Sequence, residues 1–580
     1  MTRKGADIVV EAFKKEGVEV IFGYPGGVIL DTFDKMNLAV PAFKFVQCRH
    51  EQGGSFMADG YARVTGRPGV LVVTSGPGAT NVITGLANAY MDSIPMVVIT
   101  GQVPTTAIGN DAFQEVDITG ITRPVTKHNY LVKDVRDLPQ ILKEAFYLAS
   151  TGRPGPVLVD LPKDVQRAEC DVPYPDTVAM PTYRPTFEGN MNQVKKLADA
   201  IKRAKRPVAY VGGGVIHSNA SKELHAFIKK TRMPVTTTLM ALGAYPQDEP
   251  ENLMMLGMHG TKFANYAVQE CDLLLSIGAR FDDRVTGKTS EFAPKAVIAH
   301  IDIDPTSISK SVTADLPVVG DVKDVLQKLN QIVEPADISE WLNQVAEWKE
   351  KHPLRFPRNG AIMPQEVLVT LDGIVKGEAI ITTDVGQHQM WAAQYLHFKR
   401  PRTWLTSGGL GSMGYGLPSA IGAQVAAPDS LVFSINGDGG FQMCASELTT
   451  ASINRLPVIS IVLNNGYLGM VRQWQELFYK KNYAMSCMDR HDKCPWPCNE
   501  PGTQCPVYTP DLVKLAEAHA CHGQRITRRE DIEGAIRAAI DIAKNERRPS
   551  VLEFMVEREV NVYPMVPAGA RLDDMVDSLA

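Results

Sequence analysis

The stretch LVFSINGDGG, residues 431–440, and the stretch VISIVLNN, residues 458–465, are two apolar runs that each end in small or polar residues. Such a run is the pattern of a buried strand that stops at a loop. Runs that are apolar throughout are typical of parallel sheets covered by helices on both faces. Parallel sheets bind ligands at the carboxyl ends of their strands, so we expect Asp438 and Asn465 to lie at one ligand-binding edge.

The residues at this edge suit a metal ion and a diphosphate. Asp438 offers a carboxylate and Asn465 a neutral amide oxygen, and Mg²⁺ prefers oxygen ligands beside substrate phosphates. Gly437 and Gly439 would let the backbone approach a diphosphate without a Cβ in the way. The motif alone leaves a second interpretation open, in which GDGG is an ordinary turn and the Asn464–Asn465 pair belongs to an unrelated one.

The alternation of strands and helices extends outward over the whole chain. The expected helices are 5–16, 51–66, 78–91, 191–203 and 510–518, and the expected strands are 19–23, 69–74, 95–100, 155–162, 207–211, 272–278, 296–304 and 379–384. Proline-rich passages interrupt the pattern at 172–189 and 351–365. The sequence therefore predicts an α/β protein with three doubly wound parallel-sheet domains, at residues 1–180, 190–345 and 360–580.

Composition excludes several classes of function. The 580 residues carry a formal net charge of −5, so no basic field is available for nucleic acid. No run approaches 18 consecutive apolar residues, and the charged N-terminus lacks the apolar core of a signal peptide. Nine cysteines are too few for a disulfide scaffold. We therefore expect a cytoplasmic protein with neither a nucleic-acid nor a membrane partner.

One short motif favours a rival function. Residues 409–414 read GLGSMG, which matches GxGxxG between an expected strand and a helix, and Asp438 follows at a distance suited to a ribose-binding acid. This arrangement is compatible with a nicotinamide-binding Rossmann unit and a dehydrogenase. The interpretation accounts for neither Gly439 nor the Asn464–Asn465 pair, so it ranks second.

Longer strings carry a much more specific resemblance. They are FGYPGG (22–27), RHEQGG (49–54), TSGPGATN (74–81), TGQVPT (100–105), DAFQEVD (111–117), GRPGPVLVDLPKDV (152–165), LGMHG (256–260), GARFDDRVTG (278–287), VGQHQMW (385–391), GLGSMGYGLP (409–418), GMVRQWQELFY (469–479) and YPMVPAG (563–569). With them, the GDG…NN pair resembles the thiamine diphosphate (ThDP) binding motif. Nearly the whole chain resembles the catalytic subunits of the acetolactate synthase (acetohydroxyacid synthase) family.

The resemblance implies the fold and the reaction. It implies two ThDP-binding-type domains, for the pyrimidine and for the diphosphate with Mg²⁺, flanking a Rossmann-like FAD-binding domain. The implied activity is decarboxylation of pyruvate and its joining to a second pyruvate or to 2-oxobutyrate, the first common step of branched-chain amino acid biosynthesis. The implied cofactors are ThDP, Mg²⁺ and FAD, and the implied assembly is a homodimer or homotetramer with a separate regulatory small subunit.

The resemblance also implies roles for individual residues near ThDP. Glu51 matches the family's catalytic glutamate, and its small or apolar flanks would favour a protonated carboxyl group. Met413 matches the residue that holds ThDP in its bent conformation. Phe113, Gln114 and Lys163 match residues on the substrate side. The implied metal shell is Asp438, Asn465 and the backbone carbonyl of Tyr467, and the other implied ThDP contacts are Gly27, Val385, Gly386, Gln387, His388, Gly437, Gly439 and Met470.

Further residues match the acceptor and flavin sites of the family. Arg284 matches the residue that holds the carboxylate of the second substrate, and Trp474 the one that shapes the acceptor pocket and favours 2-oxobutyrate. The implied FAD contacts are Arg153, Gly212, Gly213, Gly214, Met258, His259, Gly278, Arg280, Asp302, Ile303 and Asp321. From the residues alone, purely structural interpretations stay open, such as a helix N-terminal glutamate at Glu51 and a surface salt bridge at Arg284.

The sequence departs from the family at an insert, residues 484–508. It carries Cys487, Cys494, Cys498 and Cys505 with His491 among them. Four thiols can form a zinc site, but the spacing lacks the usual CxxC pairs. A thiol-bearing loop is the preferred interpretation, with zinc or paired disulfides as alternatives.

Rival functions within the resemblance are other FAD- and ThDP-dependent enzymes. Pyruvate oxidase would consume O₂ at each turnover. Glyoxylate carboligase is disfavoured because that family lacks the glutamate found here at Glu51. A scaffold that has lost its activity is also disfavoured, because the catalytic positions are intact.

Overall fold

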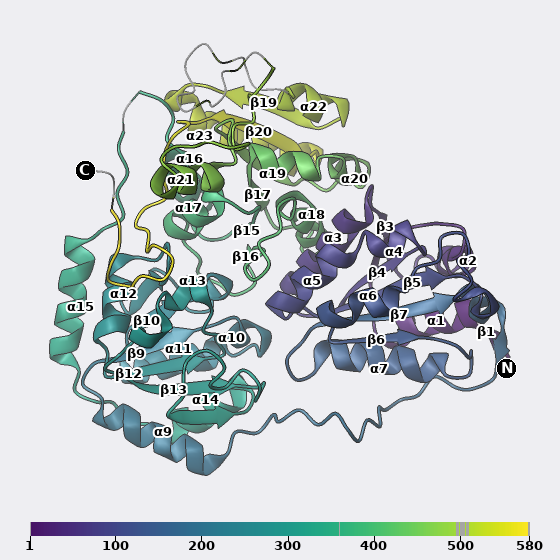
Figure 1. Cartoon of the computed structure of the whole chain (residues 1–580), viewed down its shortest axis with the longest axis horizontal. Helices are drawn as coiled ribbons and strands as arrows, with labels where there is room; N and C mark the ends of the chain where they lie inside the picture. Colours follow the sequence, from purple (N-terminus) through teal and green to yellow (C-terminus); the bar gives the residue numbers. More distant parts are fainter. Residues whose placement is uncertain are drawn as a thin grey trace.

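The structure, a computed structural model, describes residues 2–358, 360–492, 494, 498, 505 and 510–577. Three parallel sheets of six strands each form the centres of three α/β domains, which Figure 1 shows in purple and blue, in teal, and in green and yellow. The prediction of three parallel-sheet domains is confirmed. No helix in the described part of the chain is long and apolar enough to cross a membrane.

Each strand predicted from an apolar run is present, and every sheet also contains strands that the sequence analysis did not predict. The first sheet, in the order β3-β2-β4-β5-β7-β6, contains β2 (Val20–Tyr24), β3 (Lys44–Gln47), β4 (Gly69–Val73), β5 (Met96–Gln102), β6 (His128–Leu131) and β7 (Pro156–Pro162). The second, in the order β11-β10-β9-β12-β13-β14, contains β9 (Pro207–Val211), β10 (Val235–Thr237), β11 (Asn252–Met255), β12 (Leu273–Ile277), β13 (Val297–Asp302) and β14 (Leu316–Val319). The third, in the order β16-β15-β17-β18-β20-β19, contains β15 (Ile380–Thr383), β16 (Trp404–Leu405), β17 (Val432–Gly437), β18 (Ile459–Asn464), β19 (His522–Ile526) and β20 (Ser550–Met555). A short antiparallel pair joins β1 (Arg3–Lys4) to β8 (Glu169–Cys170).

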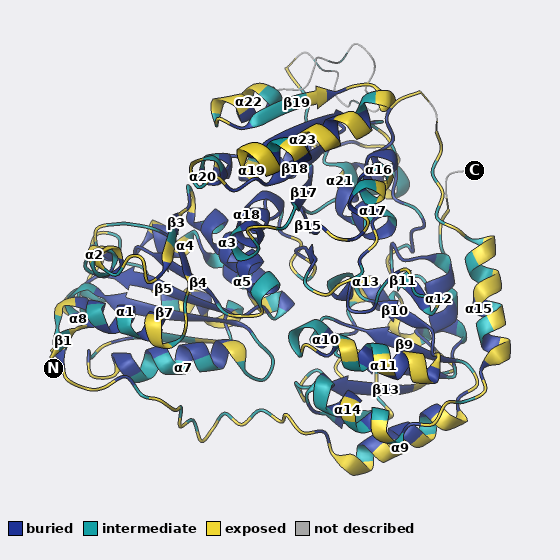
Figure 2. Cartoon of the chain, turned by 180° about the vertical axis from the view of Figure 1, so that it is seen from behind, coloured by how far each residue is buried: buried dark blue, intermediate teal, exposed yellow. Residues whose placement is uncertain are grey.

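Helices cover both faces of each sheet, as the apolar strands require. The first domain contains α1 (Gly5–Lys15), α2 (Leu30–Leu38), α3 (Glu51–Thr65), α4 (Pro77–Thr80), α5 (Ile83–Asp92), α6 (Ile118–Thr122), α7 (Leu138–Ser150) and α8 (Lys163–Arg167). The second contains α9 (Met191–Arg203), α10 (Gly214–His217), α11 (Ser221–Thr231), α12 (Lys262–Glu270), α13 (Asp283–Thr286), α14 (Val322–Ile332) and α15 (Ser339–Lys351). The third contains α16 (Pro364–Val375), α17 (Gln387–Tyr395), α18 (Gly416–Ala426), α19 (Asp438–Met443), α20 (Glu447–Ile453), α21 (Gly469–Phe478), α22 (Leu512–Ala518) and α23 (Ile532–Glu546). The strands are almost wholly buried, while outer helices such as α15 and α23 each show an exposed side (Figure 2).

The first and third domains share one hydrophobic core. Buried side chains of α3 and α5 join those of α18, α20 and α22 in a single cluster. At its centre α3 and α18 lie in backbone contact, because a Cβ on Gly422 would stand 1.9 Å from the carbonyl oxygen of Met57. The domain that begins at the N-terminus is therefore packed directly against the one that ends the chain.

One predicted helix is wrong in its extent. The expected helix 78–91 is two helices, α4 and α5, separated at Asn81–Val82. The Val82 N–H bonds three residues back to Ala79, which makes a turn rather than a continuous helix. The side chain of Asn81 is thereby directed to Glu51, to which it donates a hydrogen bond of 2.9 Å.

Candidate active site

The strand-end edge of the third sheet holds a small cavity of about 70 Å³. The residues after β15 and β17 and the loop that follows β18 meet there, because the carboxyl ends of parallel strands share one edge. Nearly every residue predicted to touch the metal or the diphosphate lines it: Val385, Gly386, Gln387, His388, Met413, Gly437, Asp438, Gly439, Asn465, Tyr467 and Met470. The exception among those predicted ThDP contacts is Gly27, which lies in the first domain.

Three buried polar atoms on residues that line this cavity lack protein partners. Oδ2 of Asp438 is buried and makes no hydrogen bond, and the same holds for Nε2 of His388 and Oε1 of Gln387. Burial raises the pKa of Asp438 to about 7. Burying a carboxylate oxygen without a partner is unfavourable, and a divalent cation would satisfy it. The donor set therefore fits Mg²⁺.

The backbone of the cavity leaves no room for larger residues. A Cβ on Gly437 would stand 2.9 Å from Nδ1 of His388, and one on Gly439 would stand 3.0 Å from Cδ2 of Leu468. The first residues of α17 and α19 line the same cavity. Unpaired N–H groups at the starts of helices bind phosphates, so the geometry fits a diphosphate beside the cation.

The loop GLGSMG is held by carboxylates. Gly408 and Gly409 donate their N–H groups to Asp92, and Gly414 donates to both oxygens of Asp384 at 3.0 Å. A dinucleotide-binding loop needs those N–H groups free for phosphate, and negative charge beside them would repel it. These hydrogen bonds instead fix the loop with Met413 in the lining of the cavity, which disfavours the dehydrogenase interpretation.

The predicted residues of the first domain form a separate group at its own strand-end edge. Glu51, 9% exposed, begins α3 and accepts the hydrogen bond from Asn81. Lys163 donates to the carbonyl of Gly27 at 3.3 Å, and Gln114 has a positive φ of 61°. Phe113 is 87% exposed. Among the main cavities in the described part of the chain, none is lined by both Glu51 and Asp438.

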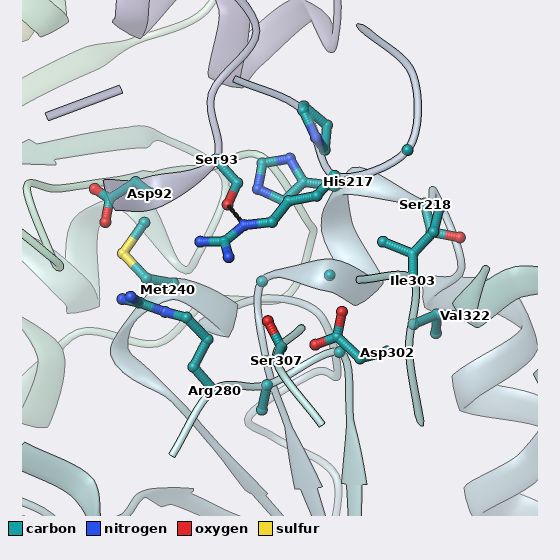
Figure 3. A pocket seen from close by; sticks show the side chains of 18 of the residues that line it. Asp92, Ser93, His217, Ser218, Met240, Arg280, Asp302, Ile303, Ser307 and Val322 are labelled. Carbon is teal, nitrogen blue, oxygen red and sulfur yellow. Dashed lines mark hydrogen bonds between the residues drawn. The ribbon is translucent and has the colours of Figure 1, made fainter. Parts of the chain in front are cut away.

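A pocket of about 200 Å³ lies between the first and second domains (Figure 3). It is lined by nine of the residues predicted to bind FAD: Arg153, Gly212, Gly213, Gly214, Gly278, Arg280, Asp302, Ile303 and Asp321. Gly212 lies so close to the carbonyl oxygen of Gly278 that a Cβ would stand 2.2 Å from it. Among the described residues the guanidinium of Arg280 finds no hydrogen-bond or ion-pair partner. A free cation beside a glycine turn fits an anionic nucleotide.

The other two predicted FAD residues, Met258 and His259, line a neighbouring apolar pocket of about 230 Å³. Arg284 and Trp474 line it too, with the guanidinium carbon 5.5 Å from the indole centre. Burial lowers the pKa of His259 to about 4, so the ring is neutral. This pocket, which Arg280 also lines, offers guanidinium groups among mostly apolar side chains, which suits a small carboxylate.

The three cavities adjoin. Met470 lines both the Asp438 cavity and the Arg284–Trp474 pocket. Met240 and Arg280 line both that pocket and the pocket between the domains. Sequence reasoning brought out neither Met240 nor the carboxylates Asp92 and Asp384. The signal for the two carboxylates was present, since each is a lone acid at the end of an apolar run.

The first residues of the cysteine insert contact the loop after β18, residues 465–468. Leu468 N–H bonds to Ser486, and Met488 N–H bonds to Gly466, both at 2.8 Å. Arg558 pairs with Asp489 at 2.6 Å and donates to the carbonyl of Asn465. The four insert cysteines are described as free and partly buried, and in the described part of the chain no three His, Cys, Asp or Glu residues group as a metal site. Most of residues 493–509 lies outside the described residues.

Comparison with known proteins agrees with this arrangement. Models of the thiamine pyrophosphate enzymes match along the chain: the N-terminal TPP binding domain over residues 3–121, the central domain over 194–329 and the C-terminal TPP binding domain over 384–554.

Individual relatives match over nearly the full length. The chloroplastic acetolactate synthase of Arabidopsis thaliana is 46% identical over 99% of this chain and 84% of its own. The acetolactate synthase isozyme 3 large subunit of Escherichia coli is 45% identical over 98% of both chains. The acetolactate synthase large subunit of Corynebacterium glutamicum is 46% identical over 98% of this chain and 90% of its own. This chain, with its three matching domains, thus belongs to the acetolactate synthase family of thiamine pyrophosphate enzymes.

Proposed function

We propose that this protein is the catalytic subunit of an acetolactate synthase. It removes CO₂ from pyruvate and joins the remaining two-carbon unit to a second pyruvate or to 2-oxobutyrate. The observation that carries the proposal is that a cavity suited to a cation and a diphosphate adjoins a pocket suited to a small carboxylate, with Met470 in the lining of both. A ligase that couples two 2-oxo acids on ThDP needs both compartments side by side.

ThDP with Mg²⁺ supplies the nucleophile and the electron sink when bound, and the protein supplies binding and orientation. Asp438, Asn465 and the carbonyl of Tyr467 would hold Mg²⁺. Met413 lines the same cavity and would support the bent form of ThDP. Glu51, on the first domain, would hold and move a proton at the pyrimidine ring.

The acceptor pocket selects the second substrate. Arg284 binds its carboxylate, which pyruvate and 2-oxobutyrate share. Trp474 and the apolar walls exclude water and contact the alkyl end. The apolar walls would also favour the loss of charge that accompanies release of neutral CO₂ from the carboxylate of pyruvate.

FAD is proposed for the pocket between the first and second domains. Its diphosphate would be held by the guanidinium groups of Arg153 and Arg280 and by the glycine turn at 212–214. The proposed reaction transfers no net electrons, so the flavin has a structural role here.

The assembly is proposed to be a homodimer or homotetramer. Glu51 and Asp438 share no cavity within the described residues of one chain, so a second copy would bring the two halves together. Apolar side chains exposed near both halves support this, with Phe113 87% and Met443 58% exposed. Because the bacterial relatives are named large subunits, we also propose a separate regulatory small subunit.

The test is acetolactate formation from pyruvate with ThDP, Mg²⁺ and FAD added one at a time to protein stripped of cofactors. Product is expected only when ThDP and Mg²⁺ are both present, with FAD adding to it. An oxygen electrode run in parallel distinguishes a pyruvate oxidase. Stoichiometric O₂ uptake, or no acetolactate with all three cofactors, would refute the proposal.

A further inference from the structure

Asp92, the last residue of α5, lies beside the residues that two of the three cavities share. It lines the pocket between the domains, on the same side as Met240 and Arg280 (Figure 3). Met240 and Arg280 also line the Arg284–Trp474 pocket. The side chain of Asp92 is 0% exposed, so its charge must be compensated by the groups around it.

Those groups come from two domains. Arg63 of α3 donates to Oδ2 of Asp92 at 2.8 Å. The N–H groups of Gly408 and Gly409, in the third domain, donate at 3.1 and 2.7 Å. One buried carboxylate of the first domain thus fixes the beginning of the loop that carries Met413.

The rest of that loop is tied down as well. Ser407 donates to Asn88 of α5 at 2.5 Å and accepts the N–H of Ser412 at 2.8 Å. Gly414 bonds to Asp384. Two of the three anchors of the Met413 loop, Asn88 and Asp92, therefore belong to a helix that also borders the pocket between the domains.

The Met413 loop is closely packed against the wall of the pocket between the domains. A Cβ on Gly408 would stand 2.2 Å from Sδ of Met240. One on Gly409 would stand 2.9 Å from Oδ1 of Asp92 and 3.3 Å from Arg280. A displacement of Met240, Arg280 or Asp92 must therefore also displace the loop, because close-packed groups transmit displacement.

We infer that Asp92 is a positioning residue that couples the pocket between the domains to the Met413 loop. A flavin nucleotide that orders this pocket wall also orders the loop, so it strengthens binding of ThDP with Mg²⁺. By linkage, ThDP strengthens flavin binding by the same factor. The inference rests on the cofactors of the proposed function and adds a reason why a flavin without redox turnover is retained.

The test is a binding cycle on the full-length protein. The affinity for ThDP at saturating Mg²⁺ is measured by tryptophan fluorescence with and without saturating FAD, and the affinity for FAD with and without ThDP. The wild type is expected to show a coupling factor of at least about fivefold in both directions. In Asp92→Asn an amide NH₂ faces groups that are themselves donors, so the factor should fall toward one.

The matched control is Asp160→Asn. Asp160 is another buried aspartate of the first domain, hydrogen-bonded to Thr100 and Gln102, and it lines none of the three cavities. This variant should lose stability to a comparable degree and keep the wild-type coupling factor. A merely structural role for Asp92 would make the two variants behave alike.

The possible results distinguish failure of this inference from failure of the proposed function. A coupling factor of one in the wild type, or an unchanged factor in Asp92→Asn, would overturn the inference. Failure of the wild type to bind ThDP or FAD at all would instead refute the proposed cofactors. If Asp92→Asn does not fold, Gly409→Ala disturbs the same contact from the loop side, because its Cβ would stand 2.9 Å from Oδ1 of Asp92. Its coupling factor must then fall, and a wild-type factor would overturn the inference.

Discussion

At the scale of single residues, the candidate site is distinguished by buried polar atoms that have no hydrogen-bond partner in the described protein. Burial raises the pKa values of both Asp384 and Asp438 to about 7. Asp384 accepts backbone N–H groups from Val385 and Gly414, whereas Oδ2 of Asp438 accepts nothing. The first is a structural carboxylate and the second has the character of a ligand. The difference between them appears only in their hydrogen-bond partners.

Glu51→Gln is predicted to remove most of the activity while leaving ThDP bound. Glutamine keeps the hydrogen bond to Asn81 but cannot move a proton, and such proton transfer contributes about 10²–10⁴-fold. The measurement is kcat together with ThDP affinity. Glu169→Gln, at an exposed position of β8, is the control and should behave as wild type. Near-normal turnover in Glu51→Gln would remove this residue from the mechanism.

Trp474→Leu is predicted to flatten the preference for 2-oxobutyrate over pyruvate as acceptor. The two acceptors differ by one methylene, which an apolar pocket discriminates by about 10–200-fold. Coupling of two pyruvates should be largely spared. A competition assay with both 2-oxo acids scores 2-aceto-2-hydroxybutyrate against acetolactate.

Arg284→Ala is the companion variant. It should weaken both couplings, because both acceptors carry the same carboxylate. An unchanged product ratio in Trp474→Leu would show that the acceptor is held elsewhere.

At the scale of elements, the decisive contact is that of α3 with α18. Glycines at the crossing let the two backbones touch, as Gly60 against the carbonyl of Ser419 and Gly422 against that of Met57 show. Helix α3 begins at Glu51, and α18 begins just after the Met413 loop. The crossing therefore sets the position of Glu51 relative to the Met413 loop.

Gly422→Ala is predicted to lower the melting temperature, although alanine is the better helix former. Its Cβ would meet the Met57 carbonyl at 1.9 Å, and overpacking of this kind costs about 1–3 kcal/mol. Gly373→Ala, in the interior of α16 with nothing within 4 Å, is the matched control. It should stabilise by up to about 1 kcal/mol. Equal shifts in the two variants would contradict the close crossing.

At the scale of the whole molecule, the Glu51 group and the residues around Asp438 line no common cavity among the main ones in the described part of one chain. Glu51 begins α3 in the first domain and Asp438 begins α19 in the third, and Figure 1 shows these two helices in different domains. The helix crossing holds these two domains in one fixed arrangement. A complete site would then take its halves from different copies.

Mixing Glu51→Gln with Asp438→Ala protein is predicted to restore activity once subunits exchange. A mixed dimer has one site with both residues intact, so random exchange should recover about a quarter of the wild-type rate. The rate is followed as the two inactive proteins are mixed, with each alone as the control. No recovery in demonstrated mixed dimers would place both residues in one chain's site.

The sequence by itself determined the three parallel sheets, because apolar runs that alternate with amphipathic helices can be buried in few other ways. It also identified the set around Asp438, since those residues follow strands at one edge, and the family resemblance supplied the roles of Glu51, Arg284 and Trp474. Only the tertiary structure could show that helix 78–91 is broken and that Met258 and His259 line the same pocket as Arg284 and Trp474. It alone revealed that Asp92 lines the pocket between the domains and also holds the start of the Met413 loop. Such facts depend on contacts between residues far apart in the chain, as that of Asp92 with Gly408 and Gly409, and no local pattern encodes the partner of a buried charge.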